Sequence, residues 1–307
     1  MSKSTSEAAN DAYQRTLSRL ESIKSHLKTT PRSGRLQGKV CIITGVDSLK
    51  GIGRASALLF AHEGAKHLYL LDYSGKNLPE LQRTIQKDYP DVQVTTVQAD
   101  AANEEAISNL CDRAIKEEGR LDVFFANAGI VSVDHLDSLT EETFMRTMRV
   151  NALSVFLAIK YASIAMAKPN LSCGKSESGG SIILTASVAG IRSGAGPIDY
   201  SASKAAVNNM AQTAAYQLAK RNIRVNSICP GLIETGMTDF TFELARRRGT
   251  AAKIGQLNPL GRYGIAEEVA QATLFLASDE SSYVNAQNIA VDGGLSGSIP
   301  VVPGKFH

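Results

Sequence analysis

The chain has 307 residues, of which 43% are hydrophobic and 21% are charged. This composition supplies enough apolar side chains for a large core and carries too little charge for a disordered chain. The net charge is only +3, and residues 1–37 hold seven Lys and Arg against three Asp and Glu, so the remainder is close to neutral. A near-neutral body without a basic stripe predicts no nucleic-acid partner.

The distribution of apolar residues, cysteines and histidines predicts the cellular setting. The most apolar stretch, 151–167, is interrupted by Lys160, so we expect no membrane span and no membrane partner. The four cysteines and five histidines are scattered without the spacing of zinc ligands, so we expect no metal site. Unpaired cysteines, and first 30 residues that contain no apolar secretory segment, predict a cytoplasmic protein.

Residues 1–37 form a predicted N-terminal arm. Their apolar residues follow steps of 4, 3, 3 and 4, which describe one face of a helix: Tyr13, Leu17, Leu20, Ile23 and Leu27. A linker over 31–34 follows. This amphipathic helix is interpreted in two ways. It docks on the body or on a neighbouring subunit, or it is a mitochondrial transit segment, although its three acidic residues are unusual in such a segment.

After the arm, short β-branched runs alternate with segments of helical periodicity, which is typical of βαβ units around a parallel sheet. We predict seven strands: Val40–Thr44, His67–Asp72, Val92–Val97, Leu121–Ala126, Ser181–Thr185, Ile223–Ile228 and Asn288–Val291. The predicted fold class is therefore α/β, a single doubly wound Rossmann domain with a seven-stranded parallel sheet. It covers residues 38–296 and is followed by a tail over 297–307.

The first predicted strand runs into a glycine-rich turn that contains Gly45, Gly51, Ile52 and Gly53. Glycines allow a tight turn and a close approach to a pyrophosphate, and the free N–H groups of the following helix bind the anion. Asp72 ends the second strand, where its carboxylate is able to accept hydrogen bonds from both ribose hydroxyls of adenosine. The sequence therefore predicts a dinucleotide site.

A second group of residues predicts proton chemistry. Tyr200 and Lys204 are four residues apart and share one helix face, so the ammonium lies near the phenol. A phenol with a pKa near 10 is a poor proton shuttle at neutral pH, and lowering this pKa by ~3 units needs ~4 kcal/mol. We expect the Lys204 ammonium, together with a positive nicotinamide ring, to lower the pKa of Tyr200. Ser187 precedes this pair.

Together these motifs resemble the short-chain dehydrogenase/reductase superfamily, in the branch with a glycine-rich TGx(n)GxG turn and a Y-x-x-x-K pair. The resemblance covers residues 38–296. The matching residues are Thr44 with Gly45, Gly51, Gly53, Asp100, Asn127 with Ala128 and Gly129, Asn151, Ser187, Tyr200, Lys204, Pro230 with Gly231, Thr235, and Asp292 with Gly293 and Gly294.

The resemblance implies four catalytic residues. Tyr200 would be the general acid/base, and Ser187 would polarise the substrate oxygen. Lys204 would hold the nicotinamide ribose and lower the pKa of Tyr200. Asn151 would order a water molecule that relays protons from Lys204 to solvent.

The resemblance also implies cofactor contacts. Thr235, after Pro230 and Gly231, would bind the carboxamide. Asn127, with Ala128 and Gly129, would stabilise the sheet beside the cofactor, and Asp100 with Ala101 would lie at the adenine. The chain departs from the family at two places: five residues (46–50) separate Gly45 from Gly51 where the family usually has three, and Ala126 precedes Asn127 where the family has a second asparagine.

These observations predict an NAD(P)-dependent oxidoreductase that interconverts a secondary alcohol and a ketone by hydride transfer. The alternative is a dinucleotide-binding scaffold or sensor without turnover. Asp72 favours NAD because it would repel the 2′-phosphate of NADP, whereas Lys50 and Arg54 would favour NADP.

The substrate is a small molecule whose identity stays open. Arg246, Arg247 and Arg248, in a predicted lid over 236–259, either contact an acidic substrate or form a solvated helix end. The resemblance and two Ala-rich helix faces, over 152–167 and 202–219, predict a homo-oligomer, a tetramer or a dimer.

Overall fold

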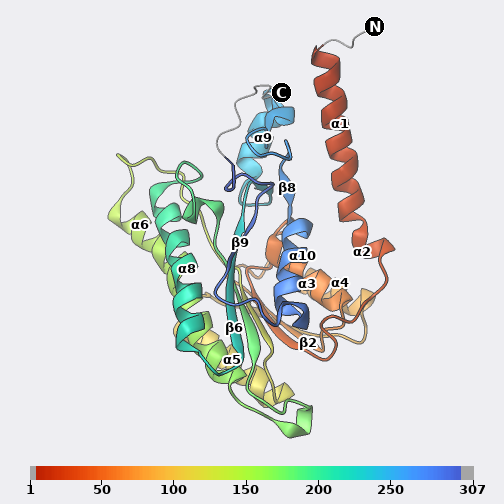
Figure 1. The fold of residues 1–307 in the computed structure, drawn as a ribbon, viewed down its shortest axis with the longest axis vertical. Helices are drawn as coiled ribbons and strands as arrows, with labels where there is room; N and C mark the ends of the chain where they lie inside the picture. Colours follow the sequence, from red (N-terminus) through yellow and green to blue (C-terminus); the bar gives the residue numbers. More distant parts are fainter. Residues whose placement is uncertain (1–4, 299–307) are drawn as a thin grey trace.

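A single parallel sheet of seven strands forms the centre of the molecule, for which a computed structural model describes residues 5–298 (Figure 1). Its spatial order is β3-β2-β1-β4-β5-β6-β9. The strands are β1 (Val40–Thr44), β2 (His67–Asp72), β3 (Gln93–Gln98), β4 (Val123–Ala126), β5 (Gly180–Thr185), β6 (Ile223–Pro230) and β9 (Asn288–Val291). The strand order reverses between β1 and β4, so the sheet is doubly wound and the predicted fold class is confirmed.

Helices cover both faces of this sheet (Figure 1). One face carries α5 (Glu104–Glu118), α7 (Ser154–Met166) and α8 (Ile198–Gln217), and the other carries α3 (Ile52–His62), α4 (Leu78–Asp88) and α10 (Ala266–Ala277). Successive residues of β1 enter opposite cores: Val40 and Ile42 pack on the α5 side, and Cys41 and Ile43 on the α3 side. All of β1 is buried because each face of a parallel sheet is covered.

The other helical segments lie in the N-terminal arm and in the connections between strands. They are α1 (Thr5–Lys24), α2 (His26–Thr29), α6 (Glu141–Met148), the π-helical turn η1 (Arg149–Leu153), α9 (Asp239–Arg247), and the 3₁₀ turns η2 (Leu171–Cys173), η3 (Val188–Gly190), η4 (Ala251–Lys253) and η5 (Asp279–Ser281). A second sheet, which the sequence analysis did not predict, pairs β7 (Ile233–Glu234) with β8 (Gly264–Ile265) in parallel. Two residues per strand are too few for a periodic signal, yet this pair joins the segments before and after the predicted lid over 236–259.

The helix over Glu141–Met166 is long and apolar enough to cross a membrane by length and composition, which the sequence analysis did not anticipate. Within it, α7 buries Val155, Leu157 and Ala158 in the core on the α5 side. A helix that covers a sheet needs such an apolar face, so packing accounts for its hydropathy. The absence of a membrane partner stays a prediction.

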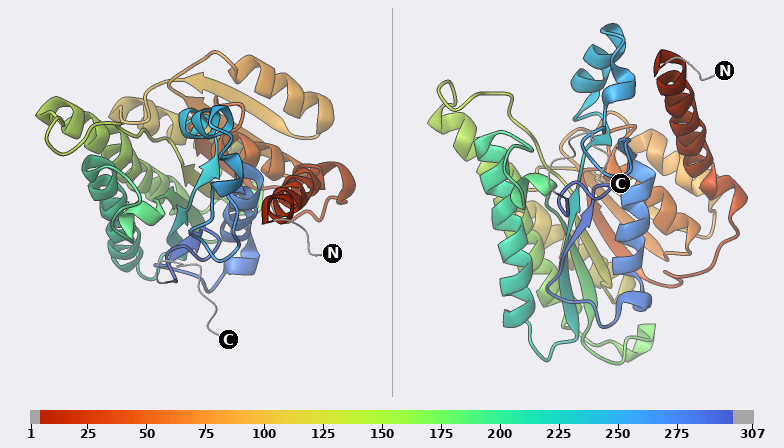
Figure 2. Two further views of the ribbon diagram at one scale, coloured as in Figure 1. Left: turned by 90° about the horizontal axis from the view of Figure 1, so that it is seen from above. Right: turned by 45° about the horizontal axis from the view of Figure 1, so that its top comes forward.

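The N-terminal arm lies against the body of its own chain, where α1 contacts α10 (Figure 2). Leu20 of α1 is buried with Phe242 of α9 and with Tyr263 and Ile265 near β8. Farther along, Arg32 pairs with Asp91 at 2.8 Å. The predicted division of the chain at residues 37 and 296 stays a prediction. Residues 1–4 of the arm and 299–307 of the predicted tail lie outside the described residues.

Candidate active site

A cavity of about 540 Å³ lies at the carboxyl ends of the central strands, beside the reversal of strand order. Ligands of doubly wound sheets bind at this place. Its wall contains most of the predicted site residues: Gly45, Gly51, Ile52, Asp72, Asn127, Ala128, Gly129, Ser187, Tyr200, Lys204, Pro230, Gly231 and Thr235. Four predicted residues, Gly53, Asp100, Ala101 and Asn151, do not line it.

Close packing explains the glycines of the turn. Gly45 has a φ of +75°, and a Cβ there would lie 2.8 Å from the Cα of Ala128. A Cβ on Gly53 would lie 2.2 Å from the carbonyl oxygen of Gly45, so Gly53 lets α3 approach the turn from behind the wall. Gly51 caps α3, which begins at Ile52 in the wall. The first N–H groups of a helix have no intrahelical acceptor and are available to a phosphate.

Two carboxylates meet at the end of β2. Asp72 accepts hydrogen bonds from the backbone N–H groups of Asp47 and Ser74, both at 2.9 Å. Asp47 in turn accepts from the Ser74 hydroxyl at 2.9 Å and from the Asn77 N–H at 2.5 Å. The longer loop over 46–50 is therefore tied to the turn after β2. Sequence reasoning missed Asp47, because its partner Asn77 is 30 positions away. Each oxygen of Asp72, which lines the cavity, accepts one of these bonds and has a second lone pair for a ribose hydroxyl, whereas one oxygen of Asp47 also accepts from the Asn77 side chain at 3.2 Å.

The two basic residues that would favour NADP have other partners. Lys50 lies 3.4 Å from Asp239 at the start of α9, and Arg54 pairs with Glu80 of α4. Neither side chain lines the 540 Å³ cavity. Both cations therefore pair with carboxylates that lie outside the cavity.

Asp100 and Ala101, which were expected at the adenine, are not among the residues that line this wall. The Asp100 carboxylate accepts from the Ala102 N–H at 2.8 Å and from Arg149 at 2.7 Å. These bonds tie the segment after β3 to η1. Asp100 and Ala101 directly follow Ala99, whose N–H donates to the carbonyl of Asp72 at 2.9 Å, and their place at the adenine stays a prediction.

The catalytic candidates come from two neighbouring segments. Tyr200 and Lys204 lie on α8, with the Lys204 Nζ 5.6 Å from the centroid of the Tyr200 ring. This Nζ donates to the carbonyl of Thr185 at 2.8 Å, at the end of β5. Ser187 follows β5, and its Oγ accepts from the Ala189 N–H at 3.1 Å.

The expected lowering of the Tyr200 pKa by Lys204 together with a positive nicotinamide ring stays a prediction, and the chain on its own shows the opposite direction. Burial raises the pKa of the Tyr200 phenol, and the Ser187 hydroxyl opposes part of this effect. Burial also lowers the pKa of Lys204 to about 8, because the ammonium is 2% exposed and has no carboxylate among its hydrogen-bond partners in the described chain. With this pKa the Lys204 ammonium still carries its charge in most molecules at pH 7.

Two asparagines hold the cavity wall in place. Asn151, fully buried in η1, accepts from the Ile130 N–H at 2.8 Å and donates to the Ile130 carbonyl at 2.9 Å. A π-helical turn often marks a functional site. Asn127 donates to the carbonyl of Gly45 at 2.9 Å and accepts from the Thr185 hydroxyl at 3.1 Å, so it joins the ends of three strands.

The segment after β6 closes the other side of the cavity. A Cβ on Gly231 would lie 2.7 Å from the Cβ of Asp292, so a glycine is needed for this approach. Thr235 lines the wall, and its N–H donates to the Thr238 hydroxyl at 3.0 Å. Within residues 5–298 no cluster of three or more His, Cys, Asp or Glu is arranged to hold a metal ion. The expectation of no metal site stays a prediction.

Comparisons with known proteins decide the family. The family profile described as enoyl-(acyl carrier protein) reductase matches residues 45–296. The 3-oxoacyl-[acyl-carrier-protein] reductase FabG of Thermotoga maritima is 41% identical over 261 residues, which cover 85% of this chain and 99% of that protein. The chain belongs to the short-chain dehydrogenase/reductase superfamily.

Other relatives agree. Levodione reductase of Leifsonia aquatica is 34% identical, over 87% of this chain and 98% of that protein. A crystal structure of levodione reductase superimposes with a TM-score of 0.77, and it covers 86% of this chain and 100% of the other. L-rhamnose-1-dehydrogenase of Scheffersomyces stipitis is 34% identical over 86% of this chain and 98% of that protein. As a short-chain dehydrogenase/reductase, the chain is an oxidoreductase of the alcohol and ketone type.

Proposed function

We propose that this protein interconverts a secondary alcohol and a ketone by hydride transfer with NAD(P), and that Tyr200 is the general acid/base. The observation that carries the proposal is the convergence of Ser187, Tyr200 and Lys204 on the cavity that the glycine-rich turn also lines. A nicotinamide cofactor supplies or accepts the hydride when bound. Hydride transfer needs a fixed geometry and one proton donor, and this wall offers both.

Each residue of the wall has a distinct task in this proposal. The Tyr200 phenol donates a proton to the ketone oxygen or takes one from the alcohol, and the Ser187 hydroxyl hydrogen-bonds to the same oxygen. Lys204 holds the nicotinamide ribose with its remaining N–H donors. Asn151, behind the wall, orders the water that carries protons to solvent. Thr235 binds the carboxamide.

We propose NAD rather than NADP as the cofactor. Asp72 at the end of β2 lines the cavity, and a like charge ~4 Å from its carboxylate would be repelled by ~1 to 4 kcal/mol. A 2′-phosphate at this place would meet that repulsion. The pairing of Lys50 with Asp239 and of Arg54 with Glu80 supports the proposal, because both cations are engaged elsewhere.

The wall beside Tyr200 supports a substrate with an apolar substituent. Ile130, Val131, Ile233 and Met237 line the cavity there. In the run of three arginines, Arg246 pairs with Glu234 and Glu243, which leaves it less able to bind an acidic substrate. A panel of secondary alcohols and ketones, assayed with both cofactors through nicotinamide absorbance, tests the function. Cofactor binding without turnover on any of them would favour the scaffold alternative.

We also propose a cytoplasmic homo-oligomer. Phe156 and Ile164 of α7 are half-exposed, and Tyr216 of α8 is 83% exposed, which leaves apolar surface for a second copy. Light scattering at micromolar concentration tests this, and a mass of one chain would overturn it. The contacts of Leu20 support docking of the arm rather than a transit role. Protein isolated from cells that begins near Gly38 would support the mitochondrial alternative.

A further inference from the structure

A buried carboxylate stands directly before Tyr200. Asp199, in the first turn of α8, is fully buried. One of its oxygens accepts from the Ser132 hydroxyl at 2.7 Å, and the other accepts from the Thr147 hydroxyl at 2.6 Å. These bonds and backbone N–H groups of the helix start hold the pKa of Asp199 below its ordinary value despite burial. A buried charge is stable in a core only when it is satisfied in this way.

The two hydroxyls belong to different parts of the site. Ser132 ends the segment over 127–132, whose Ile130 and Val131 line the cavity. Thr147 lies in α6, one turn before Asn151. Asp199 therefore joins three pieces that surround the reacting phenol: the wall after β4, the helix that carries Asn151, and the helix that carries Tyr200.

A second set of hydrogen bonds joins the same pieces. Asn151 holds both backbone groups of Ile130 and also donates to the Ser203 hydroxyl at 3.0 Å. Ser203 then donates to the carbonyl of Tyr200 at 2.7 Å. Because these bonds remain when the Asp199 bonds are lost, we expect the site to loosen rather than to unfold.

We infer that Asp199 is a positioning residue that fixes Tyr200 against the wall formed by Ile130 and Val131. The inference rests on the proposed function of Tyr200 as general acid/base. Proton transfer needs heavy atoms ~2.6 to 3.2 Å apart, and a misplacement of about 1 Å is enough to cost ~100-fold in rate. The glycine-rich turn has no part in the Asp199 bonds, so cofactor affinity should change little.

Two matched pairs of variants test this role. Thr147→Val keeps the shape of the side chain but removes the hydroxyl, whereas Thr147→Ser keeps the hydroxyl. Asp199→Asn removes the charge, and Asp137→Asn makes the same change at an exposed site. We expect kcat to fall about tenfold in Asp199→Asn and Thr147→Val, with near wild-type values in Thr147→Ser and Asp137→Asn.

Two further readouts separate positioning from loss of folded protein. The dissociation constant of the cofactor should stay within about threefold of wild type, and the deuterium isotope effect on kcat should rise because transfer becomes slower than product release. If Thr147→Val and Asp199→Asn instead match their controls in kcat and isotope effect while Tyr200→Phe is inactive, the positioning role is wrong and the proposed function stands. If Tyr200→Phe turns over like wild type, the proposed function itself is wrong.

Discussion

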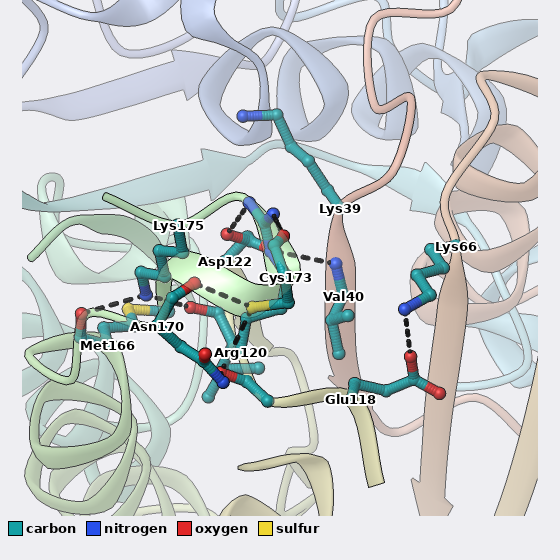
Figure 3. A network of polar contacts seen from close by, with 12 residues as sticks. Lys39, Val40, Lys66, Glu118, Arg120, Asp122, Met166, Asn170, Cys173 and Lys175 are labelled. Carbon is teal, nitrogen blue, oxygen red and sulfur yellow. Dashed lines mark hydrogen bonds and ion pairs between the residues drawn. The ribbon is translucent and has the colours of Figure 1, made fainter. Parts of the chain in front are cut away.

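The two ends of the sheet each bury a lysine, and the surroundings of the two lysines differ. At the amino end, Lys175 donates to the carbonyls of Leu121 and Met166 at 2.9 and 3.0 Å (Figure 3). Beside it, Arg120 pairs with both oxygens of Asp122 at 2.8 Å. Both lysines line a cavity, but at the carboxyl end Lys204 has one carbonyl acceptor within residues 5–298, that of Thr185, where Lys175 has two.

The comparison separates structural polar groups from functional ones. At the amino end the charges close loops onto strand ends, since Asp122 also accepts from the N–H of Val40 at 2.9 Å. A network that is satisfied in this way rigidifies its surroundings. At the carboxyl end, Lys204 keeps N–H donors for which the described chain shows no acceptor, and these are available to a ligand.

The largest expected effect is on kcat, from a substitution at the carboxyl end of the sheet. Tyr200→Phe keeps the ring and its packing but removes the proton donor, so kcat should fall by at least ~100-fold while cofactor affinity stays near wild type. Steady-state kinetics and a cofactor titration measure both quantities. A variant that retains more than about a tenth of wild-type kcat would contradict the role of Tyr200.

A reciprocal pair of variants tests the comparison itself. Lys204→Met should lower kcat by about 100-fold with little loss of stability. Lys175→Met should leave kcat unchanged but lower the free energy of unfolding by about 1 to 3 kcal/mol, because two buried carbonyls lose their donor. Urea denaturation and kinetics on both variants give the two values. Equal effects of the two variants on kcat would contradict the division of roles.

Stability should depend on pH through Lys204. Its pKa of about 8 in the folded chain lies below the ordinary value of 10.5, so the unfolded chain binds more protons between these values. The free energy of unfolding should therefore rise with pH in this window, by about 2 kcal/mol between pH 7.5 and 9.5. When the free energy of unfolding from urea denaturation is plotted against pH, the wild-type curve should rise by that amount more than the curve of Lys204→Met, which lacks this group. Parallel curves would show that Lys204 is not a buried cation of this kind.

The smallest expected effect is on cofactor preference, and it concerns Asp72 at the carboxyl end of the sheet. We expect kcat/KM to favour NAD, and Asp72→Ala should narrow the gap, chiefly by relieving repulsion of the 2′-phosphate of NADP. The ratio of kcat/KM for the two cofactors measures this. A preference of wild type for NADP above roughly tenfold, or about 1.4 kcal/mol, would overturn the choice of NAD. An unchanged ratio in Asp72→Ala would show that Asp72 does not face the ribose.

The sequence alone predicted seven strands, to within one or two residues at each end, their membership of a doubly wound sheet, and most of the residues that line the cavity. These follow from local signals: alternation of period two, glycines between a strand and a helix, and a Tyr–Lys step of one helical turn. The tertiary structure decided the rest. Asp199 meets Ser132 and Thr147 across 67 and 52 positions, and Asp47 meets Asn77 across 30. The raised pKa of Tyr200 likewise depends on burial, which helices from distant parts of the chain create. A local pattern encodes which face of an element is apolar, whereas the partner of a polar side chain is set only when distant segments pack together.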